Sequence, residues 1–202
     1  RCVRGDMSRT RGILLGCLGL LLSCSAEPEP TAKTPPLEDY GGIGGDFSLT
    51  DQSGVPFELQ ALRGRPILLF FGYTFCPDIC PVTLSKVSQV HEILGTSQQN
   101  LATVFITVDP ERDTQDKLTE YLDYFGSGII GLYGSRAETD LVIGQYGGHY
   151  SLNKEEGVID YSVDHSTSTY LLDQNGKVRF LFGHSDDPDR MAAVTGQLLD
   201  GP

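Results

Sequence analysis

The sequence predicts an α/β domain whose central sheet is mainly parallel, flanked by helices and preceded by an N-terminal hairpin. The continuous apolar run over residues 66–71 and the mostly apolar run over residues 101–108 are typical of strands that are buried on both faces. Apolar residues repeat at helical spacing over residues 81–94 and 114–125, and each of these segments follows one of the runs. Strands that alternate with helices in this way form mainly parallel sheets with helices on their faces.

The first element of the domain, which we expect to start near Gly45, is the hairpin. Residues 47–49 and 57–59 alternate apolar and polar side chains, and Gln-Ser-Gly at 52–54 lies between them. The chain then enters the buried strand at 66–71, which should lie at the centre of the sheet.

The second half of the chain continues the alternation. Thr114 is expected to cap the helix that follows it. The remaining predicted elements are a short strand at 129–133, a helix at 137–146, two strands at 167–172 and 177–182 joined through Gln-Asn-Gly at 174–176, and a last helix from Asp187-Pro188 to about residue 199. This order is similar to that of thioredoxin, so a thioredoxin-like fold is expected.

The charge of the chain excludes some classes of partner. The formal net charge is −12, and removal of residues 1–23, which carry four Arg and one Asp, leaves −15. Such a surface argues against nucleic acid and against an anionic membrane surface as partners. It suits a cation or a basic protein, and it also keeps a domain soluble.

The N-terminus has the pattern of a bacterial export signal. Met7 precedes two Arg and an apolar run at residues 13–22, which is too short to span a bilayer as a helix. The run leads into Leu-Leu-Ser-Cys at Cys24, which resembles the lipobox of lipoproteins, where the Cys carries the lipid; Cys17 ends a weaker match. An uncleaved anchor and a plain signal peptide are the alternatives.

Three regions are therefore expected. Residues 1–24 form a signal peptide and lipobox with a lipidated Cys24, residues 25–44 form a tether rich in Pro and Glu, and residues 45–202 form the folded domain. A Pro-rich tether is extended and stiff. We expect it to hold the domain off a membrane on the periplasmic or extracytoplasmic face, where thiols tend to oxidise.

Two cysteines, Cys76 and Cys80, lie in the segment TFCPDICP, where the buried strand gives way to the next helix. The start of a helix favours the thiolate, which is both a nucleophile and a metal ligand. Their spacing is one residue longer than the redox C-x-x-C, and it permits a disulfide, a redox pair or chelation. Thiolates favour Cu(I), zinc or iron–sulfur, but the other three Cys lie in the leader, which excludes a Cys₄ centre in one chain.

His165 is the best candidate for a third ligand. It lies immediately before the predicted strand at 167–172. In a thioredoxin-like sheet, the chain entering that strand packs beside the helix that carries the cysteines. Thioredoxin-like reductases have a cis-Pro there, whereas this sequence has no Pro between Pro110 and Pro188. Asp164 or a neighbouring group is expected to orient the ring.

The other three histidines are expected to lie outside the site. His91 falls at an exposed position of the first predicted helix, His149 lies in a loop, and His184 precedes the last helix.

Three motifs, in this order, resemble the Sco/SenC family of copper-binding proteins. They are FGYTFCPDICPVTL at 71–84, VDPERDT at 108–114, and DHS at 164–166 followed by YLLDQNG at 170–176. The resemblance extends over about residues 47–199. It implies a thioredoxin fold, a membrane-tethered location outside the cytoplasm, and copper binding by two motif Cys and one His, which fall on Cys76, Cys80 and His165.

The resemblance also implies a role in assembling the dinuclear copper centre of cytochrome c oxidase, with subunit II or a similar cuproprotein as the partner. Cu(I) is expected in a soft three-coordinate site, and Cu(II) with a fourth ligand such as water. Because family members act as copper donors or as thiol reductants, the alternative is a thiol-disulfide oxidoreductase that uses Cys76 and Cys80. Asp78 is expected to be solvated, and Asp109 and Asp113 to dock a partner or to cap the helix at Thr114.

Overall fold

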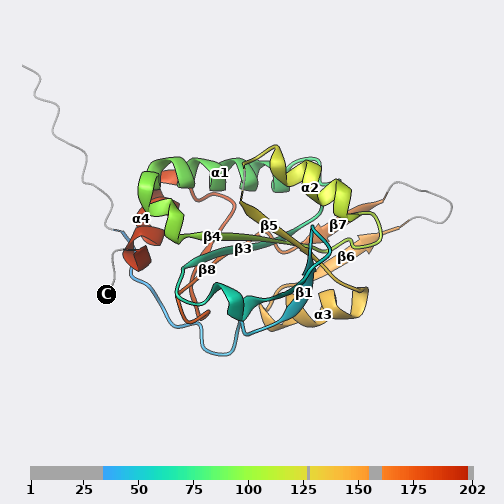
Figure 1. Cartoon of the computed structure of the whole chain (residues 1–202), viewed down its shortest axis with the longest axis horizontal. Coiled ribbons are helices and arrows are strands. Elements are labelled where there is room, and N and C mark those ends of the chain that lie inside the picture. Colours follow the sequence, from blue (N-terminus) through green and yellow to red (C-terminus); the bar gives the residue numbers. More distant parts are fainter. Residues whose placement is uncertain (1–33, 127, 155–160, 200–202) are drawn as a thin grey trace, which may run out of the picture. The chain divides into compact units, whose positions relative to one another are not determined.

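The computed structural model of the chain describes residues 34–126, 128–154 and 161–199, along which strands and helices alternate (Figure 1). In chain order the elements are β1 (Ser48–Asp51), β2 (Pro56–Glu58), the 3₁₀ helix η1 (Leu59–Leu62), β3 (Ile67–Gly72), α1 (Ile79–Leu94), the 3₁₀ helix η2 (Gly95–Asn100), β4 (Ala102–Thr107), α2 (Gln115–Asp123), β5 (Ile129–Tyr133), α3 (Arg136–Gln145), β6 (Tyr150–Asn153), β7 (Ser162–His165), β8 (Thr169–Leu172), β9 (Val178–Phe182) and α4 (Pro188–Leu199).

Seven strands form one sheet, in the order β2-β1-β5-β4-β3-β8-β9. The three central strands β3, β4 and β5 are parallel to one another, and the outer strands are antiparallel to their neighbours. Residues 67–72 pair in register with residues 102–107, so β3 and β4 end at the same edge of the sheet. The predicted thioredoxin-like α/β fold with an N-terminal hairpin is confirmed, and the parallel strands lie where the sequence is continuously apolar.

Helices cover both faces of the sheet, and the side chains of β3 show how. Ile67, Leu69 and Phe71 pack into one core cluster, which also contains residues of α3, whereas Leu68 and Phe70 point to the other face. On that other face lie α1 and α2 (Figure 1), with α4 packed against α1. Every residue of β3 is buried, which explains its uninterrupted apolar sequence.

Each helix starts within two residues of its predicted position, because local capping agrees with the apolar spacing. The Thr114 hydroxyl caps α2 by accepting from the Lys117 N–H at 3.4 Å. A capping box at the start of α3, formed by Ser135 and Glu138, was not among the predicted features. In α1, Pro81 lies in the first turn, where its missing N–H costs the helix nothing.

The structure also contains a second, two-stranded sheet, which is not among the elements predicted from the sequence. Strands β6 and β7 pair antiparallel, with Tyr150 opposite His165 and Asn153 opposite Ser162. Both strands are short and largely solvent-accessible, so neither carries the apolar run or the long alternation by which strands are recognised in a sequence. The hairpin matters for function because His165 is its last residue.

The chain contacts the domain ahead of Gly45, where the sequence predicts the folded part to begin. Leu37 and Ile43 pack against core clusters, and the Glu38 N–H donates to a backbone carbonyl of β9 at 2.9 Å. The predicted signal peptide, the lipobox and Cys24 lie outside the described residues. Within the described ranges, no helix combines the length and the apolar character that a membrane span requires.

Candidate metal centre

The end of β3 and the start of α1 place the two cysteines. Cys76 is half-buried in the connecting loop, and Cys80 is buried in the first turn of α1. The Cys80 N–H, which is one of the unpaired donors at the start of a helix, donates to the Cys76 sulfur at 3.4 Å. The helix start therefore holds the Cys76 sulfur through one of its N–H groups.

Gly72, the last residue of β3, makes room for the buried sulfur. A Cβ atom at this position would lie 2.7 Å from Cys80 Sγ and 2.8 Å from the ring of Phe105. Real side chains do not approach so closely, so any larger residue here would displace the sulfur or the ring. The glycine in the motif is thus explained by packing against the cysteine.

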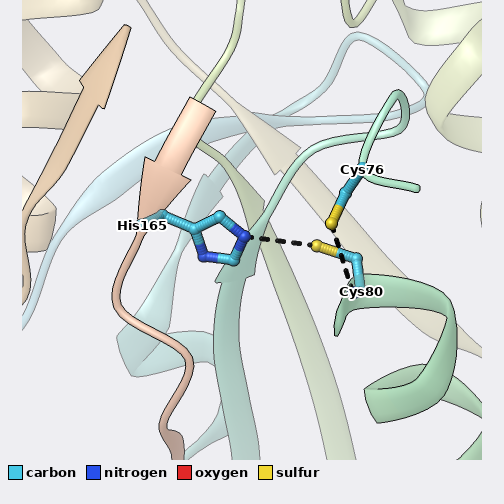
Figure 2. Close-up of side chains that lie close together, drawn as sticks. All are labelled: Cys76, Cys80 and His165. Carbon is cyan, nitrogen blue, oxygen red and sulfur yellow. Dashed lines mark hydrogen bonds between the residues drawn. The ribbon is translucent and has the colours of Figure 1, made fainter. Parts of the chain in front are cut away.

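His165 completes the group from the other side. Its Nε2 atom lies 3.5 Å from Cys80 Sγ, and the ligand atoms of Cys76, Cys80 and His165 all lie within 4.8 Å of one another. Figure 2 shows the imidazole and the two sulfurs converging from β7, the loop and α1. The structure thus brings together three residues that are far apart in sequence, at separations that one metal ion can bridge.

A backbone carbonyl fixes the orientation of the imidazole ring. His165 Nδ1 lies 2.9 Å from the carbonyl oxygen of Ser166, which can only accept a hydrogen bond. The proton of the neutral ring therefore lies on Nδ1, and the lone pair of Nε2 points at Cys80 Sγ, ready for a metal. Of the two expected groups, Asp164 or a neighbour, the structure has the neighbour orient the ring, because the Asp164 carboxylate accepts from the Asn153 side chain instead, at 2.9 Å.

The surroundings of the two thiols shift their pKa values in opposite directions. A hydrogen bond from the Cys80 thiol lowers the pKa of Cys76 from an ordinary value of 9.0 to about 3; burial opposes this, and hydrogen bonds from the backbone N–H groups of residues 78 and 80 support it. The same interaction with Cys76, together with burial, raises the pKa of Cys80. The metal-free pair therefore carries one negative charge at neutral pH, and a cation bound by both sulfurs displaces the second proton.

The other three histidines lie apart from this group. His91 is half-buried rather than exposed, because α1 turns it toward β4, where its Nε2 lies 2.8 Å from the Thr103 hydroxyl. His149 and His184 are exposed, as expected for residues in loops. Asp78 is also exposed, as predicted.

Asp109 and Asp113 do not cap α2, contrary to one of the two alternatives, because the Thr114 hydroxyl does so, and their burial leaves almost no carboxylate surface for a partner. Both are fully buried in the loop between β4 and α2. Asp113 accepts from the backbone N–H and the hydroxyl of Thr74, at 3.0 and 2.6 Å, and from the Thr107 hydroxyl at 2.5 Å. The carboxylate thus ties this loop to the cysteine segment, which no local sequence pattern could reveal.

Comparison with known proteins identifies the family. The family model described as SCO1/SenC matches residues 37–200. A SCO2-like protein from Rickettsia felis is 42% identical over 165 residues, which cover 81% of this chain and 80% of that protein. The human protein described as SCO1 homolog, mitochondrial is 36% identical over 153 residues, which cover 75% of this chain and 51% of that protein.

Solved structures agree with this result. ScoI from Bradyrhizobium japonicum with copper bound is 38% identical, with a TM-score of 0.71 over 77% of this chain and 99% of that chain. Yeast Sco1 with copper bound is 34% identical, with a TM-score of 0.70 over 77% of this chain and 87% of that chain. Sequence and structure thus give the same answer, and the chain belongs to the SCO1/SenC family.

Proposed function

We propose that Cys76, Cys80 and His165 bind one copper ion and that the protein passes this copper to an acceptor protein. The observation that carries the proposal is the convergence of two sulfurs and the Nε2 atom of an imidazole within 4.8 Å. Two soft thiolates with one imidazole suit Cu(I), and they are too few for a structural zinc site, which takes four ligands. The copper-bound relatives support the choice of metal.

The exposure of the three donors suits transfer. Cys80 is buried, whereas Cys76 and His165 line an open pocket whose rim includes Pro77, Asp78 and Thr167. Ligands of an acceptor can approach on this side and replace the donors one at a time, because a three-coordinate site leaves room for a fourth ligand. Cu(II) would be accommodated with a water molecule in that position.

The acceptor that we propose is the dinuclear copper centre of cytochrome c oxidase, in subunit II or in a similar cuproprotein. This role follows from membership of the family, and the acidic surface of the chain suits a basic partner. We further propose that residues 1–24 direct export and carry a lipid on Cys24, that the part of residues 25–44 ahead of the packed Leu37 acts as a tether, and that the domain works at the extracytoplasmic face of a membrane.

A second candidate function is thiol-disulfide exchange, because the structure leaves both thiols free and one of them accessible. The Cys76 thiolate would attack a disulfide of the partner, breaking its S–S bond and releasing one partner thiol. Cys80 would then attack Cys76 Sγ, which forms the Cys76–Cys80 disulfide and releases the second partner thiol. The partner gains two electrons and the pair loses two.

An anaerobic Cu(I) titration of the reduced protein against a competing chelator tests the copper proposal. We expect one tightly bound copper per chain and a loss of affinity of at least roughly 100-fold in His165→Ala, since even outer-shell changes cost up to this factor. His184→Ala, which changes an exposed histidine away from the site, is the matched control. Weak binding, or binding that His165→Ala leaves unchanged, would contradict the copper proposal and favour thiol-disulfide exchange.

A further inference from the structure

The hairpin that carries His165 stands apart from the main sheet. Among the described residues, β6 and β7 pair with each other in a separate two-stranded sheet, while the cysteines follow a central strand of the seven-stranded sheet. Hydrogen bonds of the main sheet therefore do not set the distance between His165 and the sulfurs. The short link from His165 to β8 and the side-chain contacts of the hairpin do so together, and several of these contacts involve Arg112.

Arg112 lies in the loop between β4 and α2 and is surrounded by aromatic rings. Its guanidinium carbon lies 3.6 Å from the ring centre of Tyr161, 4.9 Å from that of Phe75 and 5.7 Å from that of Tyr73. A planar guanidinium stacks on such rings, which a lysine ammonium cannot do in the same way. Arg112 is thus packed between three residues from two different parts of the site.

Each of these rings is connected to a predicted ligand. Phe75 is the neighbour of Cys76 in the chain. Tyr73 lies edge-on to the His165 ring, with centres 5.8 Å apart, and its hydroxyl accepts from the Val163 N–H in β7 at 3.3 Å. Tyr161 directly precedes β7. One side chain therefore contacts both the cysteine segment and the strand of the histidine.

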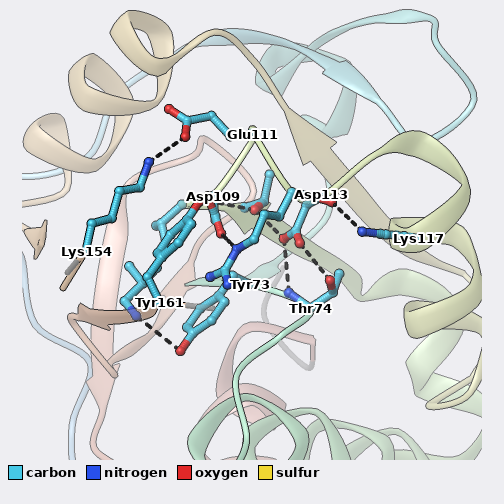
Figure 3. A network of polar contacts seen from close by, with 12 residues as sticks. Tyr73, Thr74, Asp109, Glu111, Asp113, Lys117, Lys154 and Tyr161 are labelled. Carbon is cyan, nitrogen blue, oxygen red and sulfur yellow. Dashed lines mark hydrogen bonds and ion pairs between the residues drawn. The ribbon is translucent and has the colours of Figure 1, made fainter. Parts of the chain in front are cut away.

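A buried carboxylate holds Arg112 in place. Asp109, which is fully buried, accepts from Arg112 Nε at 2.5 Å and from the Tyr161 hydroxyl at 2.7 Å. Figure 3 shows Asp109 and Tyr161 together with Tyr73 in this network. Charge-assisted hydrogen bonds of this kind are short and directional, so they fix the plane of the guanidinium as well as its position.

We propose that Arg112, held by Asp109 and Tyr161, is a positioning residue that sets the place of His165 relative to Cys76 and Cys80. The proposal rests on the proposed copper site, whose third ligand it positions. It assigns a task to Arg112 in the VDPERDT segment, beside those of Asp113 and Thr114. Substitution of an outer-shell residue that orients a ligand typically lowers metal affinity by about 10- to 100-fold.

The first experiment compares Cu(I) affinities of the reduced protein, with the metal alone as the probe. We expect Arg112→Met to weaken binding by roughly 10-fold, the lower end of outer-shell effects, and Arg112→Lys to restore little because it cannot stack. Arg179→Met is the matched control, because Arg179 also forms a half-buried ion pair with a buried aspartate, Asp173, but lies in β9.

A second set of variants separates positioning from general damage. In the His165→Ala background, Arg112→Met should cause no further loss of affinity, since the ligand that it positions is gone. Tyr161→Phe, which removes only the hydroxyl that bonds Asp109, should weaken binding in the same direction by less, and it serves if Arg112→Met does not fold. A wild-type affinity in Arg112→Met or Tyr161→Phe, or an equal loss with and without His165, would overturn the proposal.

A readout on the metal-free protein is independent of copper. Arg112→Met should speed hydrogen exchange of the Val163 amide and shift the ring resonances of His165, while amides of β3 and β4 keep their protection. Unchanged exchange and ring resonances would refute the positioning role. This readout tests the positioning role even if the wild-type protein binds no copper. That outcome would contradict the proposed copper function but not the positioning of His165 by Arg112.

Discussion

The carboxylate of Asp113 accepts two hydrogen bonds from a single residue, the backbone N–H of Thr74 at 3.0 Å and its hydroxyl at 2.6 Å. Thr74 opens the segment that carries both cysteines, and Asp113 follows the neighbouring strand of the sheet. Two loops at the same edge of the sheet are thereby joined without a covalent link. The first predictions concern this contact.

Asp113→Ala should lower the free energy of unfolding by about 2–3 kcal/mol, because it leaves buried donors of Thr74 and Thr107 without an acceptor. Chemical denaturation measures this change. Asp116→Ala removes an exposed carboxylate three residues later and is the control; we expect it to cost only a few tenths of a kcal/mol, about the worth of a charge near a helix N-terminus. Equal effects of the two changes would contradict the assignment.

The Asp113 contact should also appear in the pH dependence of stability. Burial raises the pKa of Asp113, although its hydrogen bonds with Thr107 and Thr74 oppose the shift. The folded state therefore binds a proton more tightly than the unfolded state, and stability falls as the pH rises from the ordinary value of 3.8 through the raised pKa. Asp113→Asn should remove this decline. Parallel stability profiles of wild type and variant over the acidic range would argue against it.

Gly72→Ala should disturb the site more than the rest of the fold. The added methyl group meets Cys80 Sγ and the Phe105 ring at less than 3 Å, so we expect a loss of about 1–3 kcal/mol in the free energy of unfolding and weaker binding of Cu(I). Gly144→Ala in α3 is the matched control, since a Cβ there meets no atom of the described residues within 4 Å. Wild-type copper affinity in Gly72→Ala would show that the sulfur position is not tightly set.

The Cys76 thiolate should persist far into the acidic range in the metal-free protein. Its pKa is lowered chiefly by the hydrogen bond from Cys80, so Cys80→Ala should move the midpoint of Cys76 alkylation upward toward the ordinary value of 9.0. Alkylation rates measured against pH give both midpoints, and a Cys80→Ala midpoint at or below that of the wild type would disprove the pairing.

The sequence predicts the parts of this fold that depend on local patterns. The central strands β3 and β4 are recognisable because both of their faces are buried, and Cys76 and Cys80 are placed correctly because a strand, a turn and a helix follow one another without interruption. The proximity of His165 to the cysteines is also predicted, from the order of the elements and from the absence of a Pro in the corresponding segment.

Features that depend on distant contacts could not be predicted in this way. The hairpin of β6 and β7 is short and half-exposed, and it is held by Tyr73 and Arg112 from other parts of the chain. His91 lies at a helical position that looks exposed until β4 supplies Thr103. The orienting carbonyl of Ser166 has no sequence signal at all, because every residue carries one.

The separate hairpin has a consequence for how the site opens. Two of the three donors follow a central strand of the seven-stranded sheet, and the third ends a separate two-stranded sheet, so parting them breaks the side-chain contacts of Val163 and Tyr73 but no ladder hydrogen bond of the main sheet. The free energy of that step is a local quantity, smaller than the stability of the whole domain. The position of the third donor, and with it the affinity for a metal ion, is therefore open to change by substitutions that leave the ladder of the seven-stranded sheet as it is.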